Sequence, residues 1–279
     1  MLDWWHGKLP NSEPDGITPE DHPGTLETSL INLNTTIGIS DYWNLNITST
    51  FGSRWMNWEG KHTTIHHRDE GVTGYVSTTL LARYLLFNEN IGAGKRVFLG
   101  MGLLIPSDNT FKENPYQLSN NLEKHTHFTL SEGHYKAILE LQYFKRTKKL
   151  LFFGTTFQIS KSINNSKYGY RSGDTYNLAG FAFLHHEKTL QYFSPYLTIN
   201  IIHKTKDYWE STGFAENSDG GYMNSGFGIN RDFGLFQINL TANKTFKTWL
   251  TPAGDDATQI DSKMDSYYGA ISIRKIINY

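Results

Sequence analysis

Hydrophobic and polar residues alternate along most of the chain with a period of two. In residues 29–39 the odd positions are mostly Ile and Leu, and most of the even positions are Asn or Thr. A period of two places successive side chains on opposite faces of a β-strand, so this segment is predicted to form a strand with one apolar face. Ten later segments repeat the pattern, some less regularly: 43–54, 75–86, 97–105, 135–143, 151–160, 175–184, 193–201, 221–230, 236–243 and 266–279.

The lengths of the strands and of their connections separate two all-β architectures. A soluble β-sandwich or lipocalin-like barrel also shows alternation, but globular strands average about five or six residues. Strands of about ten residues match the 9–11 that cross a bilayer at a tilt. Tight turns such as 40–42 and 146–149 alternate with long loops such as 57–72 and 107–133, and aromatic residues cluster near strand ends. We therefore predict a transmembrane antiparallel up-and-down β-barrel, with residues 1–279 as a single outer-membrane domain.

Eleven strands leave this predicted barrel one strand short. Bacterial outer-membrane barrels have an even number of strands, with both termini on the periplasmic side. We therefore expect about twelve strands, of which the first is truncated. Residues 1–25 would then hold a strand remnant followed by an outer loop, or the chain would begin upstream of Met1.

Composition excludes several function classes. The chain has 26 Lys and Arg against 27 Asp and Glu, so it lacks the basic surface of a nucleic-acid-binding protein. It has no cysteine, which excludes disulfides, thiolate metal sites and cysteine nucleophiles. No stretch approaches the roughly 20 apolar residues of a membrane helix. Residues 1–6 have neither the basic nor the apolar region of a signal peptide.

Four segments resemble motifs of the outer-membrane protein family named for the MetA pathway of phenol degradation. They are 37–45 (IGISDYWNL), 61–64 with 71–74 (KHTT and GVTG), 82–86 (ARYLL) and 100–106 (GMGLLIP). The resemblance covers about residues 25–110 and departs from the family at Thr73, Ser107 and Asp108. The closing segment 271–279 is similar to the signal read by the outer-membrane assembly machinery. The resemblance implies a channel or facilitated transporter in a Gram-negative outer membrane, for small solutes that include hydrophobic or aromatic ones.

The polar face of the strands is predicted to line the lumen, which is the functional surface of a barrel. It is dominated by Asn, Thr, Ser, Gln and Gly, which suit water and small solutes. Five charged residues are predicted on this face: Arg54, Arg83, Lys136, Glu140 and Arg274. Such charges either narrow the path and fix a ligand, or form internal ion pairs that close a small barrel. The sequence leaves both open.

Histidines are concentrated in the predicted outer loops, which hold or adjoin eight of the eleven, His134 among them. His62, His66 and His67 lie close to acidic residues and offer imidazole ligands for a divalent metal such as Zn²⁺ or Cu²⁺. The alternative is that they are solvated or hydrogen-bonded, because loops collect polar residues. A cofactor is not required under either interpretation.

Two function classes follow from these observations. The first is a passive channel or facilitated transporter whose partners are the lipid bilayer and a small solute, with no role for nucleic acid. The second is a binding barrel whose histidine-rich outer loops capture a divalent metal or a partner protein; partner subunits or a homo-oligomer fit either class. Catalysis is not expected, because no histidine is followed two residues later by serine, the arrangement of outer-membrane phospholipases.

Overall fold

The fold is all-β. The computed structural model describes residues 24–59, 68–90, 92–110, 129–148, 151–184, 193–215, 218–234, 236–250 and 267–275. Within them, eleven strands form one antiparallel sheet, and three two-residue strands form a second, small sheet. No helix in this part of the chain is long and apolar enough to cross a membrane.

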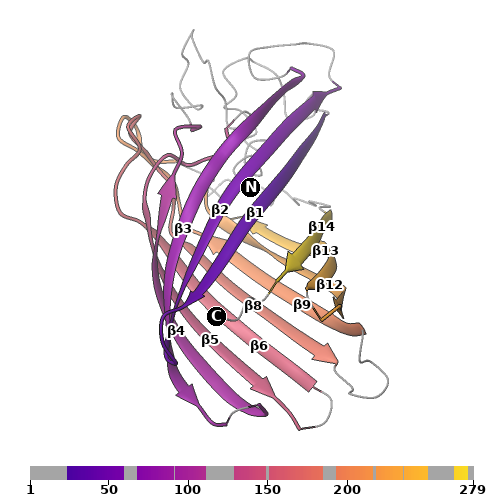
Figure 1. Ribbon diagram of the computed structural model, residues 1–279. Helices are drawn as coiled ribbons and strands as arrows, with labels where there is room; N and C mark the ends of the chain where they lie inside the picture. Colours follow the sequence, from indigo (N-terminus) through magenta and orange to yellow (C-terminus); the bar gives the residue numbers. More distant parts are fainter. Residues whose placement is uncertain are drawn as a thin grey trace.

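The large sheet is curled (Figure 1). Strands that are neighbours in the sheet also follow one another along the chain, apart from the short strands of the small sheet. Its members are β1 (Gly24–Gly38), β2 (Trp43–Trp58), β3 (Glu70–Asn88), β4 (Gly94–Pro106), β5 (Lys136–Arg146), β6 (Leu151–Ser162), β8 (Thr175–Leu184), β9 (Phe193–Lys204), β12 (Gly220–Asp232), β13 (Gln237–Leu250) and β14 (Tyr267–Arg274). These are the eleven strands that the alternation predicts, so the all-β, up-and-down antiparallel fold is confirmed.

Some strands extend beyond the alternating segments. β1 begins at Gly24 and β3 at Glu70, several residues before the apolar pattern starts. The added residues pair through the backbone, with Gly24 opposite Trp58 and Glu70 opposite Met56. Backbone pairing needs no apolar side chains, so the hydrophobic pattern understates the length of these strands.

The two faces of the sheet differ in polarity. On β5, Lys136 and Glu140 are buried on the inner face, whereas Leu139 and Leu141 on the outer face are about half exposed. The register continues this outer face as an apolar row across five strands, formed by Leu99, Leu141, Phe157, Leu178 and Ile201. Further exposed apolar residues on other strands include Leu33, Phe51, Phe227, Leu240 and Ile271. The outer face is therefore largely apolar, and the buried charges Lys136 and Glu140 lie on the inner face.

The two edge strands, β1 and β14, run in the same direction, because ten antiparallel pairings separate them. They do not pair with each other in the described residues. One strand of opposite direction would be antiparallel to both edges, which is the geometry the sequence argument for a twelfth strand requires. The strand remnant predicted in residues 1–6 lies outside the described residues, so the twelfth strand stays a prediction.

Connections alternate in length as the sequence predicts. Tight turns such as 39–42 lie at one end of the sheet, and long loops lie at the other. Two of those loops carry the small sheet, formed by β7 (Tyr170–Arg171), β10 (Tyr208–Trp209) and β11 (Gly213–Phe214). Tyr170 and Trp209 are almost fully buried against each other there. Strands of two residues have no periodicity, so the sequence did not predict them.

Candidate functional site

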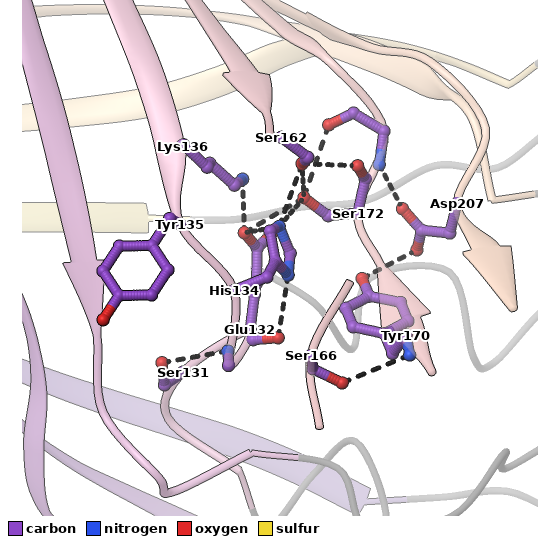
Figure 2. A network of polar contacts seen from close by, with 12 residues as sticks. Ser131, Glu132, His134, Tyr135, Lys136, Ser162, Ser166, Tyr170, Ser172 and Asp207 are labelled. Atoms are coloured by element: carbon purple, nitrogen blue, oxygen red, sulfur yellow. Dashed lines mark hydrogen bonds and ion pairs between the residues drawn. The ribbon is translucent and has the colours of Figure 1, made fainter. Parts of the chain in front are cut away.

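The long-loop end of the sheet contains a buried polar network, the rim network, formed by Glu132, His134, Lys136, Ser162 and Ser172 (Figure 2). His134 is fully buried, with Nδ1 2.9 Å from the Glu132 carbonyl oxygen. Its Nε2 lies 2.9 Å from Ser162 Oγ and 3.1 Å from Ser172 Oγ. The Glu132 carboxylate forms an ion pair with Lys136 and accepts a hydrogen bond from Ser172 Oγ. The network joins the loop before β5 to the loop between β6 and β8.

A second carboxylate, Asp207, extends these contacts to the loop after β9. It accepts hydrogen bonds from the Tyr170 hydroxyl at 3.1 Å and from the Gly173 N–H at 2.8 Å (Figure 2). It also forms a 2.6 Å ion pair with Lys204. Each ion pair is local, and it keeps its carboxylate charged in a buried site. The hydrogen bonds that Ser172, Tyr170 and Gly173 donate to these carboxylates fasten the three loops together.

Burial and neighbouring charges set the protonation states in the rim network. Burial alone would raise the pKa of Glu132, but Lys136, Lys204 and His134 together lower it to about 2. Burial lowers the pKa of His134 below its ordinary value, and Lys136 lowers it further, against the attraction of Glu132 and Asp207. At neutral pH the carboxylate is therefore ionised and the imidazole neutral.

The structure distributes the five charged residues predicted in the lumen over four places. Arg83 and Glu140 meet, with Arg83 Nε 2.6 Å from Glu140 Oε1 and Nη2 3.2 Å from Oε2. They bridge Gly100 on the intervening strand, where a Cβ atom would lie 3.1 Å from Glu140. Arg54 is buried and donates to the Thr129 carbonyl at 2.8 Å. Lys136 belongs to the rim network, and Arg274 lies at the opposite end.

Aromatic rings also cover part of the inner face. Rings from five neighbouring strands contact in sequence, at centroid distances from 4.5 to 6.2 Å. This aromatic strip consists of Phe98, Phe144, Phe152, Phe181, Phe183 and Tyr196. The sequence interpretation assigned a polar inner face and missed it. Phe152 and Phe183 lie at alternating positions that are predicted to face the lumen. Aromatic residues at such positions are the sequence signal that could have identified the aromatic strip.

The tight-turn end of the sheet has a cavity of about 900 Å³. Four cationic residues line it, and this group is called the cationic mouth: Arg96, Arg146, Lys148 and Arg274. Two rings of the aromatic strip, Phe152 and Phe183, form part of its wall. No Asp or Glu lines the cavity among the described residues.

Sequence reasoning identified only Arg274 in this group. The other three lie in or beside tight turns, which were treated as structural connections. Basic pairs and runs mark two of these turns, Lys95-Arg96 and 145–149 (KRTKK), so a charge count per turn could have found them.

The predicted metal ligands His62, His66 and His67 lie outside the described residues, so the metal hypothesis stays a prediction. In the part of the chain that is described, no group of three His, Asp or Glu side chains is placed to hold a metal ion. Titration calorimetry with Zn²⁺ and Cu²⁺, on the wild type and on a variant with these three residues changed to Ala, tests the hypothesis.

The fold is similar to that of a solved protein, described as "Crystal structure of the COG4313 outer membrane channel from Pseudomonas putida F1". The TM-score is 0.60 at 12% sequence identity, and the match covers 81% of this chain and 78% of that chain. No family model and no curated protein matches the sequence. The likeness supports the shared antiparallel barrel fold, which the sequence predicted; membership of the MetA-pathway family stays a prediction.

Proposed function

We propose that the protein is a channel of a bacterial outer membrane that passes small solutes, including hydrophobic or aromatic ones. The observation that carries this proposal is the inverted distribution of polarity. Large apolar side chains such as Leu33, at 60% exposure, and Leu197, at 66%, face outward, while Glu140 and Lys136 are buried inside. Soluble proteins rarely expose a contiguous apolar surface of this kind. Lipid on the outside and water within the lumen account for both faces.

The interior is suited to solutes with an apolar part. The aromatic strip offers ring faces along one wall, and aromatic rings pair favourably with other rings at these separations. The wall also carries inward amide side chains, such as those of Asn177 and Asn200, so it is not purely apolar. A wall of this mixed character supports passage of small amphiphilic molecules better than passage of ions alone.

A pair of neighbouring substitutions on β5 tests which face meets lipid. Leu141→Lys places a charge on the outer face and is expected to destabilise the folded protein in vesicles by about 2–4 kcal/mol at the bilayer midplane. Gln142→Lys, one residue further on, points to the inner face and is expected to cost much less. Unfolding in urea with vesicles present measures both. Equal costs for the two variants would contradict the membrane orientation.

Channel activity is tested with the purified full chain. Heat-modifiable migration on gels first shows that the barrel has folded. Planar bilayers should then show discrete conductance steps, and vesicles should swell in the presence of permeant small solutes. A folded barrel that gives neither conductance nor swelling would overturn the proposed function.

A further inference from the structure

The cations of the mouth lack the partners that other inner-face cations have. In the described residues, no hydrogen bond or ion pair joins the side chain of Arg146, Lys148 or Arg274 to another group. The remaining cation, Arg96, is held by neutral oxygens: Asn88 Oδ1 at 3.2 Å and the carbonyls of Asn90 and Gly92. By contrast, Arg83 and Lys136 each have a carboxylate partner.

Two carboxylates in the adjacent turns are engaged elsewhere. Glu89 accepts a hydrogen bond from the Lys95 N–H at 3.0 Å. Asp232 accepts one from the Gly234 N–H at 2.7 Å and one from Gln237 Nε2 at 3.2 Å. Both bind backbone groups of their own turns, and neither lines the cavity. Within the described part of the chain, no carboxylate therefore contacts the cations of the mouth directly.

Several like charges around one cavity produce a positive potential that low-dielectric walls concentrate. Rings of charged side chains of one sign select ions of the opposite sign in pores. We propose that the cationic mouth selects anionic solutes, and that its ligands are small aromatic carboxylates. This inference rests on the proposed channel function and adds the charge class of the solute to it.

The remaining wall of the cavity favours a carboxylate joined to a ring. Guanidinium groups bind carboxylates through paired N–H donors, and two guanidinium groups, those of Arg146 and Arg274, have no acceptor among the described residues. Asn239 accepts a hydrogen bond from the Tyr196 hydroxyl through Oδ1, which leaves its amide N–H groups to donate to a ligand. Phe152 and Phe183 supply the ring contacts at the same cavity. The volume of about 900 Å³ lies within the range of ordinary small-molecule sites.

The first test is the charge selectivity of the wild-type channel. With a KCl gradient across a planar bilayer, the zero-current potential should have the sign of chloride permeation. A charged cleft raises the local counter-ion concentration by at least about tenfold, so a chloride-to-potassium permeability ratio of that order is expected at low salt. The ratio should fall toward one near 1 M salt, where the Debye length is about 3 Å.

Two triple variants with the same change in charge locate the effect. R146Q/K148Q/R274Q removes the three unpaired cations of the mouth, and the permeability ratio should fall several-fold. K95Q/K145Q/R231Q removes three cations from the same end of the sheet that do not line the cavity, and the ratio should stay close to that of the wild type. An equal fall in both variants would overturn the assignment to the cavity.

The second test uses benzoate with two analogues as probes. Benzoate should reduce the chloride current in a concentration-dependent way. Benzamide, which has the ring without the charge, and acetate, which has the charge without the ring, should each reduce it at least about tenfold less well, because each lacks one of the two interactions. Equal potency of benzoate and acetate would refute the aromatic part of the inference.

The outcomes separate this inference from the proposed function. A folded barrel without conductance would overturn both. A conducting channel that prefers potassium, or shows no preference, would leave the channel standing and refute the anion selectivity. Chloride preference in the wild type alone supports the inference, even if the triple variant of the mouth fails to fold.

Discussion

At the long-loop end of the sheet, the carboxylates of the rim network and of the loop after β9 have partners of opposite sign: Glu132 has Lys136, and Asp207 has Lys204. At the tight-turn end, the cations of the mouth face a cavity with no carboxylate in its described lining. Both groups lie on the inner side of one sheet, so the difference does not come from the fold class. The difference is that the charges at the long-loop end are bound to protein groups, whereas the cations of the mouth are available to a ligand.

A charge that already has a protein partner is occupied, and its removal disturbs the structure. A solvated charge without a protein partner contributes little to stability but remains able to attract a mobile ion. The rim network therefore acts as a fastening between loops, and the cationic mouth as a recognition surface. The experiments below test that division, from the largest expected effect on stability to the smallest.

Removing the carboxylate of the rim network should have the largest effect. Glu132→Ala leaves the buried Lys136 without its partner, and breaking a buried pair in this way costs about 3–5 kcal/mol. The free energy of unfolding in vesicles measures the loss. The matched control is Asp108→Ala, because the Lys167–Asp108 pair is largely exposed and an exposed pair contributes about 0–1 kcal/mol. Similar losses in the two variants would show that the rim network is not a fastening.

Adding one methyl group to the aromatic strip should have an intermediate effect. A Cβ atom at Gly154 would overlap the Phe144 ring and lie 2.9 Å from Phe181 Cζ, so Gly154→Ala forces the rings apart. Overpacking of this kind typically costs about 1–3 kcal/mol. Gly38→Ala is the control, because a Cβ atom there would have no neighbour within 4 Å. Thermal unfolding of both variants distinguishes a packed strip from loosely placed rings.

Acidification should weaken the rim network in two steps. The pKa values of Glu132 and His134 both lie below their ordinary values, so the unfolded chain binds more protons and the free energy of unfolding decreases as pH falls. The His134 contribution is complete above its ordinary pKa of 6.5 and decreases below it. The Glu132 contribution is complete above 4.5 and is lost as pH approaches about 2.

The His134→Gln variant isolates the first of these steps. Its free energy of unfolding should lose the pH dependence that the wild type shows just below pH 6.5, and should keep the acidic step due to Glu132. The charged groups facing His134 are Glu132, Lys136 and Asp207, and the pKa of Glu132, about 2, lies far below that range. An unchanged pH profile in the variant would mean that another group is responsible.

The strands and the contacts between charges differ in how far the sequence could predict them. Each strand carries its own alternation, so all eleven could be predicted locally, including the face on which Arg83 and Glu140 lie. Their ion pair could not be predicted, because it depends on the register of three strands and on the absence of a side chain at Gly100. A periodicity gives the face of a residue but not its neighbour across the sheet.

Both charged groups depend on residues distant in the sequence. In the sequence, nothing distinguishes Ser162, at the end of a strand, or Ser172, in a loop, from other serines. Both become hydrogen-bond partners of His134 because the fold places its imidazole between them. Likewise, Arg96 and Arg274 become neighbours of one cavity only when the sheet curls and brings separate turns together. The sequence marks such residues as polar, and only the three-dimensional arrangement shows which of them are paired.

Neutralising the mouth should have the smallest effect on stability. Arg146, Lys148 and Arg274 are solvent-exposed and unpaired in the described structure, so R146Q/K148Q/R274Q breaks no ion pair. Each surface substitution of this kind changes stability by no more than about 0.5 kcal/mol, and relief of repulsion between like charges favours the variant. The free energy of unfolding should therefore equal or slightly exceed that of the wild type, while the permeability ratio falls. A clear loss of stability would mean that these cations have structural partners, and the contrast between the two ends of the sheet would disappear.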